Sequence, residues 1–221
     1  MWADYVDFLR DRYPDLLAAT QEHLTISAVS ILLGAALAVP LGIYLSGNRK
    51  KLLHTAVFSV ANLFQTIPSL ALLAVLIPLM GIGMRPAIFA LFLYSLLPIL
   101  RSTYAGFQSV DPAILESAKG MGYSKAQRLL QIQFPLAFPY IMSGIRLTTV
   151  YIISWTTLAA LIGAGGLGQL IVSGIGVNRT ELIVCAAVCA IVLALLADRV
   201  LGFVEKRFSR KARTSVDASL I

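Results

Sequence analysis

Long apolar runs alternate with short polar and basic segments along the whole chain. A helix needs about 20 apolar residues to cross the hydrocarbon core of a bilayer, and five runs reach that length: 24–45, 52–78, 87–107, 140–162 and 182–204. The second run contains Gln65, Pro68 and Pro78, which favours two broken pieces over one straight helix, and the third is expected to bend near Pro98. The pattern predicts an all-α integral membrane protein with about five transmembrane helices, or six if the second run forms two spans.

The composition fits this prediction. Of the residues, 58% are hydrophobic and only 13% are charged, and the mean hydropathy is +0.81. A soluble fold of 221 residues cannot bury that much apolar surface. The net charge of +7 would suggest a nucleic-acid partner in a soluble protein, but the basic residues stand in short clusters between the apolar runs. That distribution indicates membrane topology and argues against nucleic acid.

The basic residues also predict the orientation of the chain, because cytoplasmic connections are enriched in Lys and Arg. One side of the membrane receives Arg49, Lys50, Lys51, Arg101, Lys119, Lys125, Arg128, Lys206, Arg207, Arg210, Lys211 and Arg213, whereas the other receives Arg10, Arg12, Arg85 and Arg179. We therefore expect the N-terminus outside and the C-terminus in the cytoplasm. The chain would divide into an extracytoplasmic segment (1–18), a transmembrane domain (19–204) and a basic cytoplasmic tail (205–221).

A polar loop at 108–138 separates the third and fourth runs, on the predicted cytoplasmic side. Asp111 followed by Pro112 is a helix-start signal, which predicts a short helix from Pro112 to Lys119 that Gly120 and Gly122 would end. A second helix is expected from Tyr123 to Gln131, with Pro135 and Pro139 stopping it before the fourth span. Two short helices joined at glycines and bounded by prolines form a compact projection that suits docking into another protein.

The same loop resembles the EAA loop of ABC-importer permeases. The family pattern of Glu, a small residue, Ala, three residues, Gly, nine residues, Ile, one residue, an apolar residue and Pro falls here on Glu116, Ser117, Ala118, Gly122, Ile132, Phe134 and Pro135. Ser117 and Phe134 depart from the usual Ala and Leu. The resemblance implies a type I ABC importer fold, with Tyr123 to Leu130 as the coupling helix in a groove of a separate ATPase. The expected coupling residues are Glu116, Ala118, Gly120, Gly122, Tyr123, Lys125, Arg128, Leu129, Ile132 and Pro135.

A glycine-rich stretch from Gly163 to Gly168 formally satisfies both the dinucleotide fingerprint and the glycine spacing of a P-loop. A P-loop needs Lys and Ser or Thr directly afterwards, whereas this chain has Gln169 and Leu170. The stretch also follows a membrane span rather than a strand, and it is predicted to face outward. We expect it, with Gly174 and Gly176, to fold the chain back near the outer surface, to line a path or to meet a solute-binding protein; a flexible loop is the alternative.

The fourth run is unusually polar, so we expect it to face other helices or a water-filled path. Tyr151 and Trp155 share one helical face, where they could attract an ammonium group or simply pack. Around Pro68, the broken second run could expose backbone carbonyls to the path. The path candidates are Gln65, Thr66, Ser69, Tyr151, Trp155 and Thr156. Other polar side chains, Arg146, Asp198, His23 and His54, are expected at span boundaries.

Three stretches, 65–71, 97–101 and 160–168, resemble permeases of osmoprotectant importers for glycine betaine, carnitine and choline. That family implies two permease subunits, identical or homologous, a cytoplasmic ATPase dimer that binds ATP and Mg²⁺, and an extracytoplasmic binding protein, in a bacterial inner membrane. This chain would have no catalytic, cofactor or metal site. Alternative interpretations are the same machine with another cargo, such as an amino acid, or an ion-gradient-driven secondary transporter. The latter predicts acidic residues at mid-membrane, and none stands in the first four runs.

Overall fold

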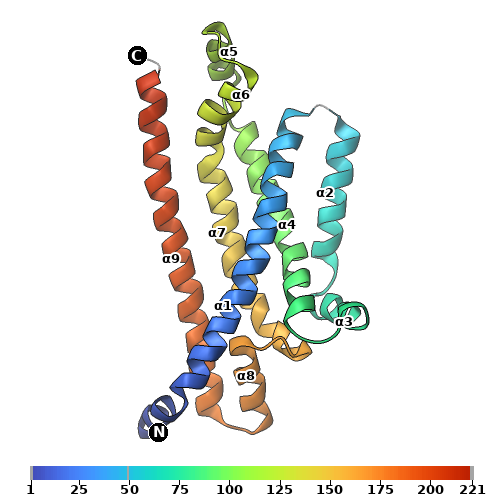
Figure 1. Cartoon of the computed structure of the whole chain (residues 1–221), viewed down its shortest axis with the longest axis vertical. Coiled ribbons are helices and arrows are strands. Elements are labelled where there is room, and N and C mark those ends of the chain that lie inside the picture. Colours follow the sequence, from blue (N-terminus) through green and yellow to red (C-terminus); the bar gives the residue numbers. More distant parts are fainter. Residues whose placement is uncertain (1, 49, 220–221) are drawn as a thin grey trace.

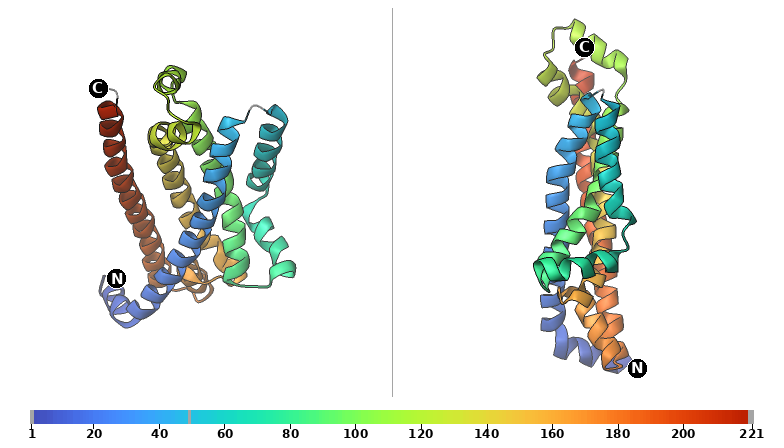
Figure 2. Two further views of the ribbon diagram at one scale, coloured as in Figure 1. Left: turned by 45° about the horizontal axis from the view of Figure 1, so that its top comes forward. Right: turned by 90° about the vertical axis from the view of Figure 1, so that its right-hand side faces the viewer.

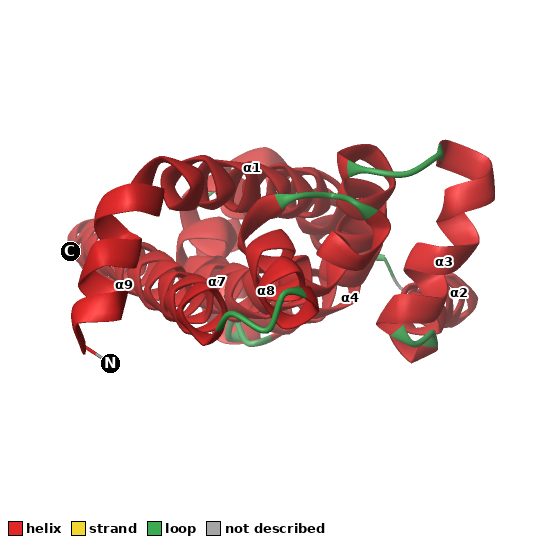
Figure 3. Cartoon of the chain, turned by 90° about the horizontal axis from the view of Figure 1, so that it is seen from below, coloured by secondary structure: helices red, strands yellow, loops and turns green. Residues whose placement is uncertain are grey.

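The computed structural model describes residues 2–48 and 50–219, and the side chains of Tyr5, 10–48 and 50–208. The described part is helical and contains no strand (Figures 1 and 3). Its elements are α1 (Trp2–Gly47), α2 (Lys51–Thr66), α3 (Ser69–Met80), α4 (Met84–Gln108), α5 (Pro112–Gly120), α6 (Lys125–Gln127), the π-helix η1 (Arg128–Gln133), α7 (Phe134–Ala159), the 3₁₀ turn η2 (Ala160–Ile162), α8 (Gly166–Gly176) and α9 (Thr180–Ser219). The predicted basic residue Arg49 and the side chains of Arg210, Lys211 and Arg213 lie outside the described residues.

Four described helices are long and apolar enough to cross a membrane: Arg10–Gly47, Met84–Gln108, Lys125–Ile162 and Thr180–Phe208. A fifth crossing is possible only if α2 and α3, which meet at an angle of 96°, are counted together. With 16 and 12 residues, each of these two helices is too short to span the hydrocarbon core alone. The second run is therefore broken as expected, and six complete spans are excluded for the described chain.

Pro68 causes the break. Its ring disfavours helical geometry at the preceding residue, and Ile67 is extended, with φ −71° and ψ 129°. Pro68 also lacks the N–H that would continue the α2 ladder.

The helices form a bundle whose connections gather at its two ends (Figures 1 and 2). The C-terminal end of α1, the N-terminal end of α2, α5, α6 and the C-terminal end of α9 lie at one end, whereas the N-terminal part of α1, the α3–α4 connection and α8 lie at the other. Helix α4 packs against both α1 and α7, and α7 packs against α9. All segments that were assigned to the cytoplasmic side from their basic residues therefore share one end of the molecule.

Small residues allow the central helices to approach closely, as is common inside membranes. On α1, Gly34 faces Ser95 of α4, and on α7, Gly144 faces Ser102 of α4. A Cβ atom at Gly144 would lie 2.3 Å from the Cβ of Ser102, which is too close for two carbon atoms. These glycines set the spacing of α4 from its two neighbours.

Buried polar side chains tie α1 to α7. The His23 Nε2–H donates to the Ile153 carbonyl at 2.9 Å, and the Ser27 and Thr156 hydroxyls lie 3.0 Å apart. His23 is fully buried in the contact between α1 and α7. Helix α1 begins well before the predicted run, so His23 lies inside this helix and not at its end.

A charged network joins α7 to α9. The Arg146 guanidinium makes two hydrogen bonds to the Asp198 carboxylate, one of them at 2.7 Å, and lies 3.6 Å from Glu205. Gly202 leaves room for it, since a Cβ there would lie 3.1 Å from the guanidinium carbon. Asp198 thus pairs within the chain and across helices, rather than with the adjacent Arg199.

We expect Asp198→Asn to lower the thermal midpoint of the detergent-solubilised protein by several degrees, because it removes the acceptor of a two-pronged ion pair. Differential scanning fluorimetry measures this shift. The exposed neighbour supplies the control, so Arg199→Gln should leave the midpoint within a degree or two. Equal midpoints for Asp198→Asn and the unmodified chain would show that the network does not hold α9 against α7.

Candidate coupling loop and path wall

Helix α5, the first part of the polar loop, is built from local signals. The Asp111 carboxylate accepts the Ala113 N–H at 2.8 Å, and Pro112 stands in the first turn. At the other end Gly122 has φ +86°, with the Tyr123 N–H donating to the Ala118 carbonyl and the Gly122 N–H to the Lys119 carbonyl. This is a Schellman end, so Gly122 makes the turn, whereas Gly120 is still part of the helix.

The second part of the loop does not stop at the prolines. Ser124 and Gln127 form a capping box that starts α6, and the chain then passes through η1 directly into α7. Pro135 stands at the start of α7, directly after η1, and Pro139 lies inside α7. The predicted separate helix from Tyr123 to Gln131 is therefore wrong, because the wider π-helical turn carries the chain past Pro135.

The expected coupling residues divide into a surface set and a supporting set. Glu116, Gly120, Gly122 and Lys125 are exposed, and the apolar Met121 and Leu130 beside them are 53% and 65% exposed. The supporting residues are buried or half-buried: Ala118, Tyr123, Arg128, Leu129, Ile132 and Pro135. Exposed apolar side chains on a projecting loop are typical of a surface that another protein covers.

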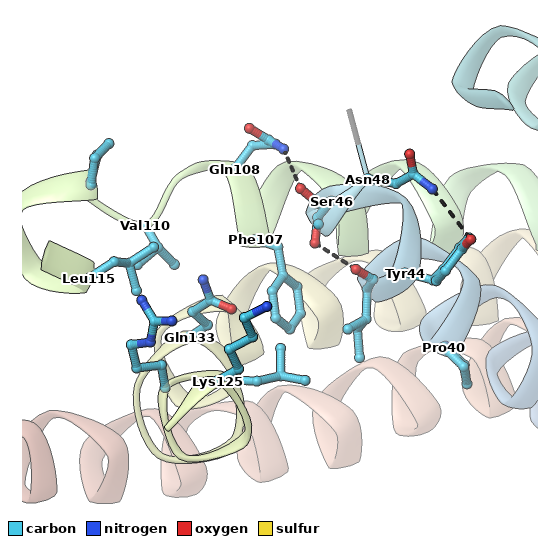
Figure 4. A pocket seen from close by; sticks show the side chains of 15 residues that line it. Pro40, Tyr44, Ser46, Asn48, Phe107, Gln108, Val110, Leu115, Lys125 and Gln133 are labelled. Atoms are coloured by element: carbon cyan, nitrogen blue, oxygen red, sulfur yellow. Dashed lines mark hydrogen bonds between the residues drawn. The ribbon is translucent and has the colours of Figure 1, made fainter. Parts of the chain in front are cut away.

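A pocket of about 1000 Å³ separates the polar loop from the ends of α1 and α4. Lys125 and Gln133 reach into it from the loop, opposite Phe107 of α4 and Ser46 and Asn48 at the end of α1 (Figure 4). The Gln108 side-chain amide closes one edge by donating to the Ser46 carbonyl at 3.2 Å. The pocket thus separates only part of the loop from the bundle, because Leu129 packs against the apolar cluster around Phe107.

Three aromatic rings form a row between α4 and α7, which we call the path wall (Tyr94, Trp155 and Tyr151). The ring centroids of Tyr94 and Trp155 lie 4.9 Å apart, and those of Trp155 and Tyr151 lie 6.1 Å apart. Tyr94 is buried and Tyr151 is 48% exposed. The spacing of Tyr151 and Trp155 predicted that they share a face, whereas Tyr94 was not among the predicted path residues, because no pattern along the chain marks a contact between two distant helices.

Tyr94 also joins the wall to the broken span. Its hydroxyl donates to the Ile67 carbonyl at 2.7 Å, and the Gln65 side-chain amide donates to the Tyr94 carbonyl. Of the other predicted path residues, Thr66 is exposed and Ser69 is half-buried beside the break. Thr156 is not at this surface, because it is fully buried against Ser27 of α1.

The glycine-rich stretch turns the chain into α8 at the opposite end of the molecule from the polar loop (Figure 1). Gly163, Gly165 and Gly166 all have positive φ. The Glu22 carboxylate of α1 accepts the Gly166 N–H at 2.8 Å. A carboxylate from the chain itself thus caps the N-terminus of α8, the place where a phosphate would bind in a nucleotide site.

Comparison with known proteins agrees with this arrangement. Residues 38–210 match the family described as binding-protein-dependent transport system inner membrane component. The chain is 46% identical to the choline transport system permease protein OpuBB of Bacillus subtilis over 204 residues, covering 92% of this chain and 93% of that protein. It is 44% identical to the carnitine transport permease protein OpuCB of Listeria monocytogenes, covering 94% of each.

Solved structures show the same fold. An inward-facing MetNI methionine ABC transporter superposes with a TM-score of 0.75 and 25% identity, covering 89% of this chain and 96% of that chain. An amino acid ABC transporter crystallised with histidines also superposes with a TM-score of 0.75, at 19% identity, covering 90% of this chain and 96% of that one. The chain therefore belongs to the binding-protein-dependent transport system inner membrane component family, as a membrane-spanning permease subunit of an ABC importer and not as its catalytic subunit.

Proposed function

We propose that this permease carries a small osmoprotectant with a quaternary ammonium group, such as choline, carnitine or glycine betaine. The observation that supports this most strongly is the identity of 44–46%, over nearly the full length, with permeases whose names specify choline or carnitine transport. The path wall adds a chemical reason, because aromatic ring faces attract cations that carry little hydration. The structural neighbours that carry amino acids are less similar in sequence, at 19–25% identity.

In this proposal the polar loop is the docking site for the ATPase. Its surface set projects from the end of the molecule that carries the basic connections, and Met121 and Leu130 offer apolar contact area there. Orientation follows from the same charges, with this end in the cytoplasm and the N-terminal end of α1 outside. The working complex would contain two permease subunits, an ATPase dimer that binds ATP and Mg²⁺, and an extracytoplasmic binding protein.

Uptake of labelled solutes by cells that contain the complete complex tests the cargo. We expect choline, carnitine or glycine betaine to be taken up, and methionine and histidine neither to be taken up nor to compete. Uptake of an amino acid with no response to any quaternary ammonium compound would contradict the proposed cargo, while leaving the permease assignment intact.

The path wall yields a residue-level prediction. Tyr151→Leu should raise the KM for a quaternary ammonium substrate by roughly fivefold to thirtyfold, because loss of one cation–π contact costs about 1–2 kcal/mol. Phe203→Leu is the matched control, since Phe203 is an exposed aromatic residue of α9; its KM should be unchanged. If the two variants have the same KM, Tyr151 does not contact the substrate.

A further inference from the structure

The pocket behind the polar loop contains positive charge without a counter-charge. Lys125 and Arg128 both line it, and no carboxylate of the described residues does. Among the residues whose side chains the structure describes, neither cation has an ion-pair partner. The Arg128 Nε atom is buried and has no hydrogen-bond acceptor there. The Arg128 side chain is half-buried, and a half-buried cation without a counter-charge is costly unless an anion binds to its accessible part.

The π-helix η1 brings the donors to one side. In a π-helix residue i bonds to residue i+5, so Arg128 and Gln133 come onto the same face of η1, and Lys125 lies about one turn before Arg128. All three line the pocket. The site is therefore made by a backbone irregularity that an ordinary α-helix would not supply.

The partial negative charge at the C-terminal ends of α1 and α4 repels an anion, but it is smaller than the positive charge of Lys125 and Arg128. Each helix C-terminus carries roughly half an elementary charge, and one of the carbonyls involved, that of Ser46, already accepts from Gln108. Two full positive charges on Lys125 and Arg128 outweigh this effect. The field in the pocket favours an anion.

Apolar side chains also line the pocket, beside the polar Ser46, Asn48, Gln108 and Gln133, and they lead toward the membrane-spanning part of the chain. Pro40, Ile43 and Tyr44 lie on α1 within the segment that spans the bilayer, and Phe107 and Leu129 continue the apolar surface. The pocket thus carries its cations on the loop side and apolar side chains on the α1 side. Basic pockets between helices at the inner face of a membrane bind anionic lipid headgroups.

We propose that this pocket binds an anionic phospholipid, with the headgroup phosphate on Arg128 and Lys125 and the glycerol and upper acyl part against Pro40, Ile43 and Tyr44. The lipid would fill the gap between the polar loop and the ends of α1 and α4. It would thereby brace the loop at the height of the membrane surface. The site does not depend on which solute the permease carries.

The test uses the full chain purified in mild detergent and examined by native mass spectrometry with phosphatidylglycerol or phosphatidylcholine added. We expect phosphatidylglycerol adducts to exceed phosphatidylcholine adducts, and the double variant Lys125→Gln/Arg128→Gln to retain about tenfold less phosphatidylglycerol. The control removes the same charge at the same end of the molecule: Lys50→Gln/Lys51→Gln changes two exposed residues outside the pocket and should retain the lipid.

Three results would overturn the proposal, provided that circular dichroism shows both double variants to be folded. The first is equal retention of the two lipids by the unmodified chain. The second is a thermal shift with inorganic phosphate alone that Lys125→Gln/Arg128→Gln abolishes while lipid retention is unchanged, which would assign the pocket to free phosphate. The third is that Lys125→Gln/Arg128→Gln no longer co-purifies with the ATPase but retains the lipid as the unmodified chain does. That result would assign the pocket to an acidic side chain of the ATPase.

Discussion

Gly122→Val should abolish most solute uptake while the chain still inserts and folds. Gly122 has φ +86°, a conformation that costs a non-glycine residue about 1–2 kcal/mol and a β-branched residue more. A Cβ added at Gly122 would meet no described atom within 4 Å, so strain in the backbone rather than a clash is the cause. Opening this turn misplaces α6 and the exposed Leu130 relative to α5. We expect uptake to fall by about tenfold or more.

The nearby Gly120 provides a matched control. It is exposed, has no described atom within 4 Å of an added Cβ, and lies inside α5 without a positive φ. Gly120→Ala should therefore keep the turn intact, lower uptake far less than Gly122→Val does, and stabilise α5 slightly, by roughly 0.5–1 kcal/mol. Transport of labelled substrate, normalised to the amount of protein in the membrane, measures both variants. Normal uptake by Gly122→Val would remove the polar loop from the coupling route.

Gly168→Ala, in contrast, should impair folding of the chain. A Cβ at Gly168 would lie 2.1 Å from the Thr157 carbonyl oxygen and 2.7 Å from the Thr157 carbonyl carbon. These are backbone atoms of α7, which cannot move aside as a flexible side chain could. Overpacking of this kind costs about 1–3 kcal/mol and occasionally more. The yield of monodisperse protein after detergent extraction should fall several-fold.

Gly176 is the control for this substitution. It ends α8, and no described atom lies within 4 Å of an added Cβ, so Gly176→Ala should give a normal yield. Size-exclusion chromatography of both variants compares them directly. A normal elution profile for Gly168→Ala would mean that α8 does not pack on α7 as described.

Local signals were sufficient to predict the first half of the polar loop. Asp111, Pro112 and Gly122 act on their own neighbours in the chain, and α5 ends one residue from the predicted position. The break at Pro68 was predictable for the same reason, since a proline restricts the residue before it wherever it stands. The prediction that Pro135 ends a helix before the fourth span was wrong, because the chain continues through η1 into α7 at this proline.

Contacts between distant segments could not be predicted. Tyr94 meets Trp155 across α4 and α7, Arg146 finds Asp198 across α7 and α9, and Glu22 reaches Gly166 from α1. Each pair depends on how helices are arranged in space, which apolar periodicity does not specify. Thr156 illustrates the same limit, because a polar residue in a span has two ways to avoid lipid. It can face a path or a neighbouring helix, and here it faces α1.

The docking of the polar loop on an ATPase is tested most directly by crosslinking. A photoreactive amino acid is placed at Leu130, which is 65% exposed on the loop, or at Ile82, which is 74% exposed in the connection at the opposite end of the bundle. After illumination of the assembled complex, we predict an adduct with the ATPase subunit from position 130 and none from position 82. An adduct from position 82, or none from position 130 in a complex that still co-purifies, would contradict docking at the polar loop.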